Sequence, residues 1–297
     1  MNRAFIFIIT GAGLWGTIGW FVKHLYAYGF TPMEVVSLRA FTAAFVLIVY
    51  LSLTSPKMLK LKKFTDIKYF IGTGIFSIIF FNYCMFMTIE LSTIPVATAL
   101  LYTAPGFVII LSFLFFKEPI TKIKLATLLI TLIGSAFVAG LIPLNLELFQ
   151  FTTILFGLGS GLGYALYSIF SKFALKKYSS LSITTYTFIM AAIALVPFFP
   201  FKEKLELFLE IKVLLFSFGL GILPTAFAYI IYTYGLNKTE ASKASILSTI
   251  EPVVATIIGI FVFTEPFSFV QMIGMSLIIL AVILIQLDSK KVPSKTQ

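Results

Sequence analysis

The chain has 297 residues, of which 59% are apolar and only 11% are charged, and its mean hydropathy is +1.04. Soluble domains are about 45–50% apolar and about 25% charged, so a soluble protein could not cover this much apolar surface with so few charges. The composition therefore predicts an integral membrane protein. The net charge of +10 then concerns membrane orientation, and we expect no nucleic-acid partner.

Ten apolar runs follow one another along the chain, each long enough for a helix that crosses a lipid bilayer, which takes about 20 residues. Because backbone groups find no water in hydrocarbon, every run should be helical. The first run lacks a convincing small-x-small cleavage site, so we expect it to be a retained helix rather than a signal peptide. The runs cover residues 4–22, 33–53, 69–89, 94–116, 122–142, 152–174, 181–200, 211–234, 240–263 and 268–287.

The basic residues divide unequally between the two sets of connecting segments. With the N-terminus inside, five of the 22 fall in the outer segments, namely Lys23, Arg39, Lys202, Lys204 and Lys212, and the other 17 fall inside. Positive residues concentrate on the cytoplasmic side of membrane proteins. The sequence therefore predicts a multi-pass protein of the cytoplasmic membrane with both termini in the cytoplasm.

The two halves of the chain resemble each other. With a shift of 147 residues, Phe116-x-Glu118-Pro119 aligns with Phe263-x-Glu265-Pro266, and with a shift of 149 residues Lys23 aligns with Lys172. Five helices per copy is an odd number, so the second copy must enter the membrane upside down. The expected fold is thus all-α, with ten transmembrane helices in two inverted repeats, residues 1–146 and 147–297, and a substrate site near the midplane between them.

Equivalent helices of the two halves carry a stripe of small and hydroxyl residues, with Pro105 in one and Thr249 and Pro252 in the other. A spacing of three and four residues puts each stripe on one helix face, where it either packs helices closely or lines a wet cavity. A proline near the midplane frees a backbone carbonyl and permits bending. We therefore expect Pro105 and Pro252 to act as hinges.

The ten-run layout, Leu14-Trp15-Gly16 in the first run, and the paired blocks Pro105–Glu118 and Pro252–Glu265 resemble the EamA-type branch of the drug/metabolite transporter superfamily. The resemblance covers about residues 4–288. It implies a secondary carrier with two five-helix repeats around a central cavity, often an exporter of amino acids or other small metabolites. The first copy departs from the second by having Ala104 where the second has Glu251.

Several polar aromatic and amide side chains lie well inside the predicted spans. A phenol, indole or amide deep in hydrocarbon needs a partner or a wet cavity. These residues therefore either line the substrate cavity or make hydrogen bonds between helices. The candidates for substrate binding are Trp15, Asn82, Tyr83, Tyr102, Tyr164, Tyr167, Tyr229 and Tyr232, together with Thr249 and Glu251.

Glu251 lies about 16 Å along its predicted helix at about 1.5 Å per residue, near the bilayer midplane. An ionised carboxylate is costly there and usually marks an ion path, a proton relay or a ligand counter-ion. We expect no Lys, Arg or His at matching depth. Glu251 then either exchanges a proton during transport, pairs with a substrate ammonium, or donates a hydrogen bond to backbone freed by Pro252.

Three other features have structural explanations. Gly157-x-Gly159-x-Gly161-x-Gly163 lies inside a lipid-length run with no preceding strand, so it favours close helix packing over phosphate binding. Glu118 and Glu265 end equivalent helices and either cap them or take part in transport. One histidine and one cysteine, Cys84, predict neither a metal site nor a disulfide, and we expect no cofactor.

The sequence thus favours a secondary transporter, not an enzyme, that moves a small metabolite by alternating access. An amino acid or amine-like compound is the expected cargo, export is the expected direction, and a proton is the expected coupling ion. The alternative is an integral-membrane enzyme acting on a lipid or isoprenoid substrate. Such an enzyme needs acids, histidines or metal ligands clustered at one membrane face, whereas the carboxylates here are scattered along the chain.

Overall fold

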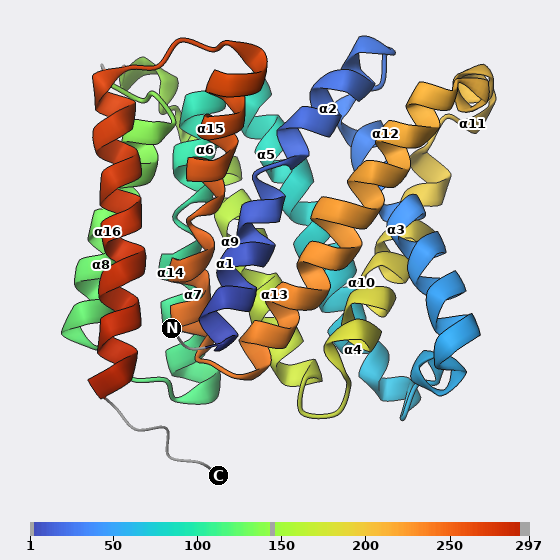
Figure 1. Cartoon of the computed structure of the whole chain (residues 1–297), viewed down its shortest axis with the longest axis horizontal. Helices are drawn as coiled ribbons and strands as arrows, with labels where there is room; N and C mark the ends of the chain where they lie inside the picture. Colours follow the sequence, from blue (N-terminus) through green and yellow to red (C-terminus); the bar gives the residue numbers. More distant parts are fainter. Residues whose placement is uncertain (1–2, 143–145, 292–297) are drawn as a thin grey trace.

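The computed structural model describes residues 3–142 and 146–291, which form a bundle of helices joined by short turns (Figure 1). Within these ranges, nine helical stretches are long and apolar enough to cross a membrane. They cover Arg3–Ala27, Pro32–Thr54, Phe64–Leu91, Ile94–Phe116, Phe151–Ala174, Ser180–Phe198, Ile211–Asn237, Ala241–Phe263 and Phe269–Asp288. The fifth predicted run, 122–142, contains a shorter helix of 17 residues, α8.

Most of the long stretches are built from more than one helical segment. The α-helices in the order of the chain are α1 (Arg3–Trp15), α2 (Ile18–Ala27), α3 (Pro32–Thr54), α4 (Ile67–Ile71), α5 (Phe80–Leu91), α6 (Ile94–Leu101), α7 (Ala104–Phe116), α8 (Lys122–Val138), α9 (Phe151–Ala174), α10 (Ser180–Leu195), α11 (Phe201–Lys204), α12 (Ile211–Gly221), α13 (Ala228–Asn237), α14 (Ala241–Ser248), α15 (Glu251–Phe263) and α16 (Phe269–Lys291). Two segments have π-helical turns, η3 (Gly72–Ile79) and η7 (Ile222–Phe227). The described residues also form five short 3-10 turns. Three lie in the connections, η1 (Pro56–Leu59), η4 (Leu146–Leu148) and η6 (Glu206–Leu209), and two lie at ends of the membrane-length stretches, η2 (Phe64–Asp66) and η5 (Val196–Phe198).

Three of the predicted runs are interrupted, which corrects the expectation of continuous helices over 4–22, 94–116 and 240–263. The interruptions separate α1 from α2, α6 from α7, and α14 from α15. At the last two, Pro105 and Pro252 stand in the first turn of the following helix. A proline fits there because its missing N–H would have no helical partner in any case.

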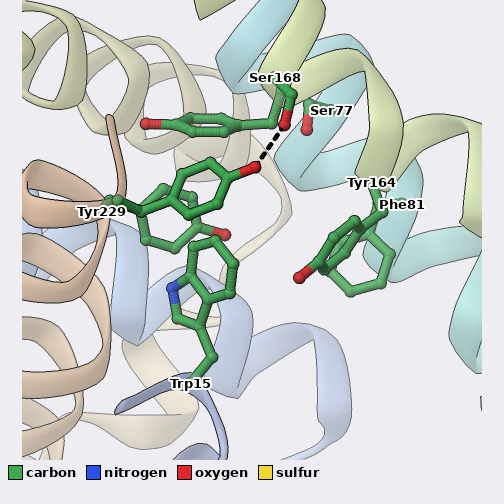
Figure 2. Close-up of a pocket in the computed structure, with 8 residues that line it drawn as sticks. Trp15, Ser77, Phe81, Tyr164, Ser168 and Tyr229 are labelled. Carbon is green, nitrogen blue, oxygen red and sulfur yellow. Dashed lines mark hydrogen bonds between the residues drawn. The ribbon is translucent and has the colours of Figure 1, made fainter. Parts of the chain in front are cut away.

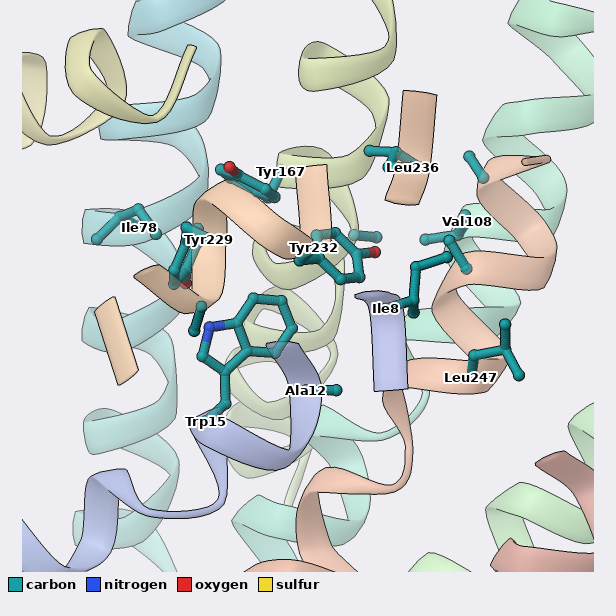
Figure 3. Packing of buried hydrophobic residues seen from close by; sticks show 14 of the residues in the cluster. Ile8, Ala12, Trp15, Ile78, Val108, Tyr167, Tyr229, Tyr232, Leu236 and Leu247 are labelled. Atoms are coloured by element: carbon teal, nitrogen blue, oxygen red, sulfur yellow. The ribbon is translucent and has the colours of Figure 1, made fainter. Parts of the chain in front are cut away.

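Helices α8 and α16 lie side by side at one edge of the bundle, and α3 and α12 form the opposite edge (Figure 1). The contact of α8 with α16 is close because glycines face each other: a Cβ atom added to Gly134 would lie 2.9 Å from the carbonyl oxygen of Gly274. Between the edges, α1 packs on α13, and α5 packs on α9. Buried side chains from α1, α7, α9, α13 and α14 form the largest apolar cluster at the centre (Figure 3).

The glycine series of α9 serves close packing, as predicted. A Cβ atom at Gly163 would lie 2.9 Å from Cα of Phe81, and one at Gly161 would lie 2.6 Å from Oγ1 of Thr103. Added methyl groups would therefore clash with helices of the first half of the chain. These contacts bring α9 close to α5 and to the interruption between α6 and α7, where the candidate site lies.

Candidate functional site

A cavity of about 230 Å³ lies beside the three helix interruptions. It is bounded by the end of α1, the start of α2, the middle parts of α3, α5 and α9, and the points where α6 ends and where α13 and α15 begin. Both halves of the chain therefore contribute to its wall. The polar and aromatic residues that line it are Trp15, Arg39, Asn82, Tyr102, Tyr164, Tyr229 and Glu251, and the others include Gly16, Phe81 and Ala255.

Glu251 is the first residue of α15 and carries one of the two charges of the cavity wall. Its Oε2 accepts a hydrogen bond of 3.0 Å from the hydroxyl of Tyr164 on α9. The Glu251 side chain thus accepts its hydrogen bond from a tyrosine of the second half of the chain. A carboxylate in the first turn of a helix is favourably placed relative to the helix dipole.

Arg39 is the other charge, and its position corrects the sequence analysis. Sequence reasoning assigned Arg39 to an outer segment and expected no basic side chain at the depth of Glu251. In the structure Arg39 lies within α3, is 6% exposed, and lines the same cavity as Glu251. The sequence signal for this position is that Arg39 is the one basic residue in a mostly apolar helix of 23 residues, since a charge inside a span usually faces a cavity or partner.

Two side chains hold the Arg39 guanidinium in place. Its Nε donates to Oγ1 of Thr225 at 2.8 Å, and one terminal nitrogen donates to the hydroxyl of Tyr229 at 3.2 Å. Both acceptors are neutral, and the ion pairs of the described residues include none that joins Arg39 to Glu251. The cavity therefore has a cationic and an anionic side chain on its wall, neither neutralised by direct contact with the other.

A smaller hollow of about 10 Å³, about the size of one water molecule, shares Trp15, Tyr164 and Tyr229 with this cavity, and its lining is drawn in Figure 2. The ring of Trp15 lies 4.9 Å from that of Tyr229 and 4.8 Å from that of Tyr232, measured between centroids. Tyr232 and Ser168 share a hydrogen bond of 2.7 Å, and so do Tyr167 and Thr233. Within the described chain, the buried Nε1 of Trp15 has no hydrogen-bond partner.

The remaining predicted site residues lie in different places. Asn82 lines the cavity, but its amide nitrogen donates to the carbonyl of Ile78 at 2.7 Å. Tyr167 and Tyr232 line only the small hollow. Two residues depart from the expectation: Tyr83 is 48% exposed on the outer side of α5, and the Thr249 hydroxyl donates to the carbonyl of Ile246 at 2.6 Å, away from the cavity.

Side chains at equivalent sequence positions make different contacts at the two ends of the bundle. At the end of the bundle where α16 finishes, Glu118 accepts hydrogen bonds from the backbone N–H groups of Ala241 (2.7 Å) and Ser242 (3.0 Å), the first two residues of α14. Lys172 donates to the carbonyls of Leu236 and Thr239 at the end of α13. Of the two roles foreseen for Glu118, helix capping is present, although the capped helix is another one.

At the opposite end, the equivalents of these two residues pair with each other instead. Lys23 and Glu265 form an ion pair of 2.6 Å, and each side chain is 51% exposed. At the end with Glu118 there is also an ion pair of 2.6 Å between Asp66 and Lys177, and this hydrogen bond raises the pKa of Lys177. At these equivalent positions, the end with Glu118 and Lys172 therefore has buried contacts and the other end an exposed one, although Lys204 and Glu34 form a further, largely buried ion pair of 3.2 Å at that other end.

The EamA-like transporter family matches the chain twice, over residues 2–140 and over residues 151–287. The chain belongs to the EamA-like transporter family. A relative described as an uncharacterized transporter of Archaeoglobus fulgidus is 31% identical over 282 residues, which span 93% of this chain and 94% of the relative. The uncharacterized inner membrane transporter YicL of Salmonella typhimurium is 23% identical over 98% of this chain and 97% of its own.

The fold of this EamA-like chain also matches a solved crystal structure with a TM-score of 0.78 and 18% sequence identity, over 99% of this chain and 100% of the other. At this identity the match concerns the fold alone. Together with the membrane-length helices, the family assignment makes the chain a multi-pass membrane transporter of small molecules. The relatives in this comparison are likewise described as transporters.

Proposed function

We propose that the chain is a secondary transporter for a small metabolite with an amino group, in the first place an amino acid, and that it works as an exporter in the cytoplasmic membrane. The observation that carries the proposal is the cavity with Glu251 and Arg39 on one wall. A substrate ammonium is attracted by the carboxylate, and a substrate carboxylate fits the planar fork of the guanidinium.

The proposed architecture has ten spans in two inverted repeats, residues 1–146 and 147–297, with α8 as the fifth span and α16 as the tenth. Three observations support it. The family matches twice, over 2–140 and 151–287; the interruption between α6 and α7 has its counterpart between α14 and α15; and η3 has its counterpart in η7. The predicted excess of inner basic residues supports termini in the cytoplasm.

The proposed mechanism is alternating access to the cavity, with a proton as the coupling ion and Glu251 as the group that carries it. With the termini inside, Glu118 and Lys172 lie at the inner end. Their buried contacts with α13 and α14 support a state that is closed toward the cytoplasm, because the equivalent Lys23 and Glu265 at the outer end form an exposed ion pair, with Lys23 also over the ring of Phe263. Pro105 and Pro252 are the proposed hinges, since each follows an interruption of its helix.

Transport by the purified protein in liposomes tests the proposed function. A panel of labelled amino acids, amines, sugars and nucleosides is offered under an imposed pH gradient, and the lumen is analysed for the compound and for products. We expect saturable accumulation of at least one amino acid, recovered chemically unchanged and dependent on the gradient. Accumulation of sugars or nucleosides alone would contradict the substrate class, and chemical conversion of a lipid would favour the membrane enzyme.

The contact of Glu118 with α14 gives a separate prediction for the inner gate. Glu118→Gln should make a cysteine introduced at Ser168, in a Cys84→Ser background, react about tenfold faster with an impermeant thiol reagent from the inner side, because hydrogen bonds to a charged group contribute about 1.5–3 kcal/mol. Glu265→Gln is the matched control and should leave this rate unchanged. Equal rates in both variants and the parent would show that Glu118 does not hold the gate.

A further inference from the structure

A second cavity, of about 420 Å³, opens where α7, α9 and α13 end, on the side of the bundle that we propose to be cytoplasmic. Its wall is of two kinds. Three lysine side chains and one amide form the polar part, and aromatic and aliphatic side chains form the rest. The residues are Lys117, Lys172, Lys176, Asn237, Phe115, Phe116 and Leu175.

The positive charge of this wall is not cancelled by nearby acids. Among the residues that the structure describes, no acidic one lines the cavity. The two carboxylates that act on Lys172 electrostatically, Glu118 and Glu240, already have partners: Glu118 caps α14, and Glu240 lies 2.8 Å from the Nζ atom of Lys124. Lys172 is fixed by two backbone carbonyls. An anion in the cavity would therefore meet three cations, one of them preorganised.

The backbone at Lys117 is a second, independent observation. Lys117 ends α7 in the left-handed conformation with a φ of 58°, which is uncommon for a residue other than glycine. Thr264 has the same conformation, with a φ of 52°, at the end of α15. The turn itself therefore does not require a lysine at this position.

The cationic wall is not repeated at the other end of the bundle. By the shifts that relate the two halves, the counterparts of Lys117, Lys176 and Asn237 are Thr264, Ala27 and Glu90. One end of the bundle thus has a basic cavity, whereas the equivalent positions at the other end have two fewer basic residues and one more acidic residue. Such a difference fits a ligand that is confined to one membrane face.

The apolar part of the wall continues onto the outside of the bundle. Phe115 is 56% exposed, and Phe113 and Leu114 on the same helix are also exposed. A ligand with its anionic group among the lysines could therefore lay apolar chains along α7. We propose that this cavity binds the phosphate group of an acidic phospholipid of the inner leaflet, since basic pockets between transmembrane helices recognise such head groups.

Binding of a short-chain phosphatidylglycerol to the purified full chain in a neutral detergent tests the proposal. We expect saturable binding that the double variant Lys117→Gln/Lys176→Gln weakens about 30-fold, because each basic residue near an anionic lipid contributes about 1 kcal/mol. Lys57→Gln/Lys60→Gln removes the same charge from the connection after α3 and is the matched control. Neither pair belongs to the substrate cavity, so transport activity is not needed for the readout.

Further arms of the experiment separate the sources of the ligand. Phosphatidylcholine of the same chain length should not bind measurably, and inorganic phosphate should compete only at far higher concentration than the lipid. Equal binding of the acidic lipid to both double variants would overturn the site, and equal binding of phosphatidylcholine would overturn the role of charge. Inorganic phosphate that binds as tightly as the lipid would overturn the lipid assignment. The inference rests on the proposed orientation, whereas a failure of amino-acid transport would leave these binding results standing.

Discussion

Glu251→Gln should abolish the pH dependence of transport or lower the affinity for the substrate by at least about tenfold, with the fold intact. Glutamine keeps the shape of the side chain and can still accept the hydrogen bond from Tyr164, but it neither titrates nor carries charge. A charged side chain inside a span that faces a cavity typically serves ion or substrate binding. The measurement is the initial rate of substrate uptake into liposomes between pH 5 and pH 8, with thermal unfolding as the check on folding.

Two further variants serve as a control for the loss of charge and as a test of the hydrogen bond to Tyr164. Glu210→Gln removes an exposed carboxylate just before α12 and should change neither rate nor pH profile. Tyr164→Phe removes the hydrogen bond while leaving the carboxylate, so a smaller effect than that of Glu251→Gln is expected. Unchanged transport with an unchanged pH profile in Glu251→Gln would leave Glu251 with a structural role only.

The membrane-length helices were predictable because the hydrocarbon core imposes both their length and their composition. Their interruptions were only partly predictable. Pro105 and Pro252 indicated bending, though not a break, near two of them, and the break between α1 and α2 has no proline. There the hydroxyl of Thr17 donates a 2.7 Å hydrogen bond to the carbonyl of Leu14 and so takes the place of a backbone N–H donor. That compensation depends on a local side-chain conformation, which the apolar pattern does not record.

The depth of the candidate site residues in the membrane was predictable, but the helix face on which each one lies was not. Tyr83 and Asn82 are neighbours in the sequence and lie at nearly the same depth, yet Asn82 lines the cavity and Tyr83 is 48% exposed. Successive residues of a helix point about 100° apart, so depth alone cannot assign both. Without an amphipathic contrast between water and lipid, the sequence gives little indication of which helix face meets the cavity.

Arg39 escaped prediction for a different reason. Counting basic residues for the orientation treats each one as belonging to a connecting segment, and this is true of most lysines. Arg39 is instead satisfied inside the bundle by Thr225 and Tyr229, which lie more than 180 positions away in the sequence. Contacts between the two halves of the chain depend on the packing of α3 against η7 and become visible only in the structure.

Arg39→Gln should reduce transport of an amino acid by about 30-fold or more but reduce transport of the amine that lacks its carboxylate much less. Removing one partner of a buried charged pair typically costs about 2–5 kcal/mol. If the guanidinium binds the substrate carboxylate, this cost arises only for substrates that have one. Competition assays with matched amino acids and decarboxylated amines give the ratio of the two affinities.

The selectivity ratio separates this role from a structural one. A variant that merely loosens the bundle would weaken both substrates alike, whereas loss of the carboxylate partner changes their ratio. Arg39→Lys keeps the charge but lacks the planar fork, so we expect it to restore only part of the amino-acid preference. Thr225→Val removes the neutral partner of Nε and should lower that preference less than Arg39→Gln, because the guanidinium keeps its contact with Tyr229. Equal losses for amino acid and amine in Arg39→Gln would refute carboxylate binding and leave Arg39 as a tie between α3 and the second half of the chain.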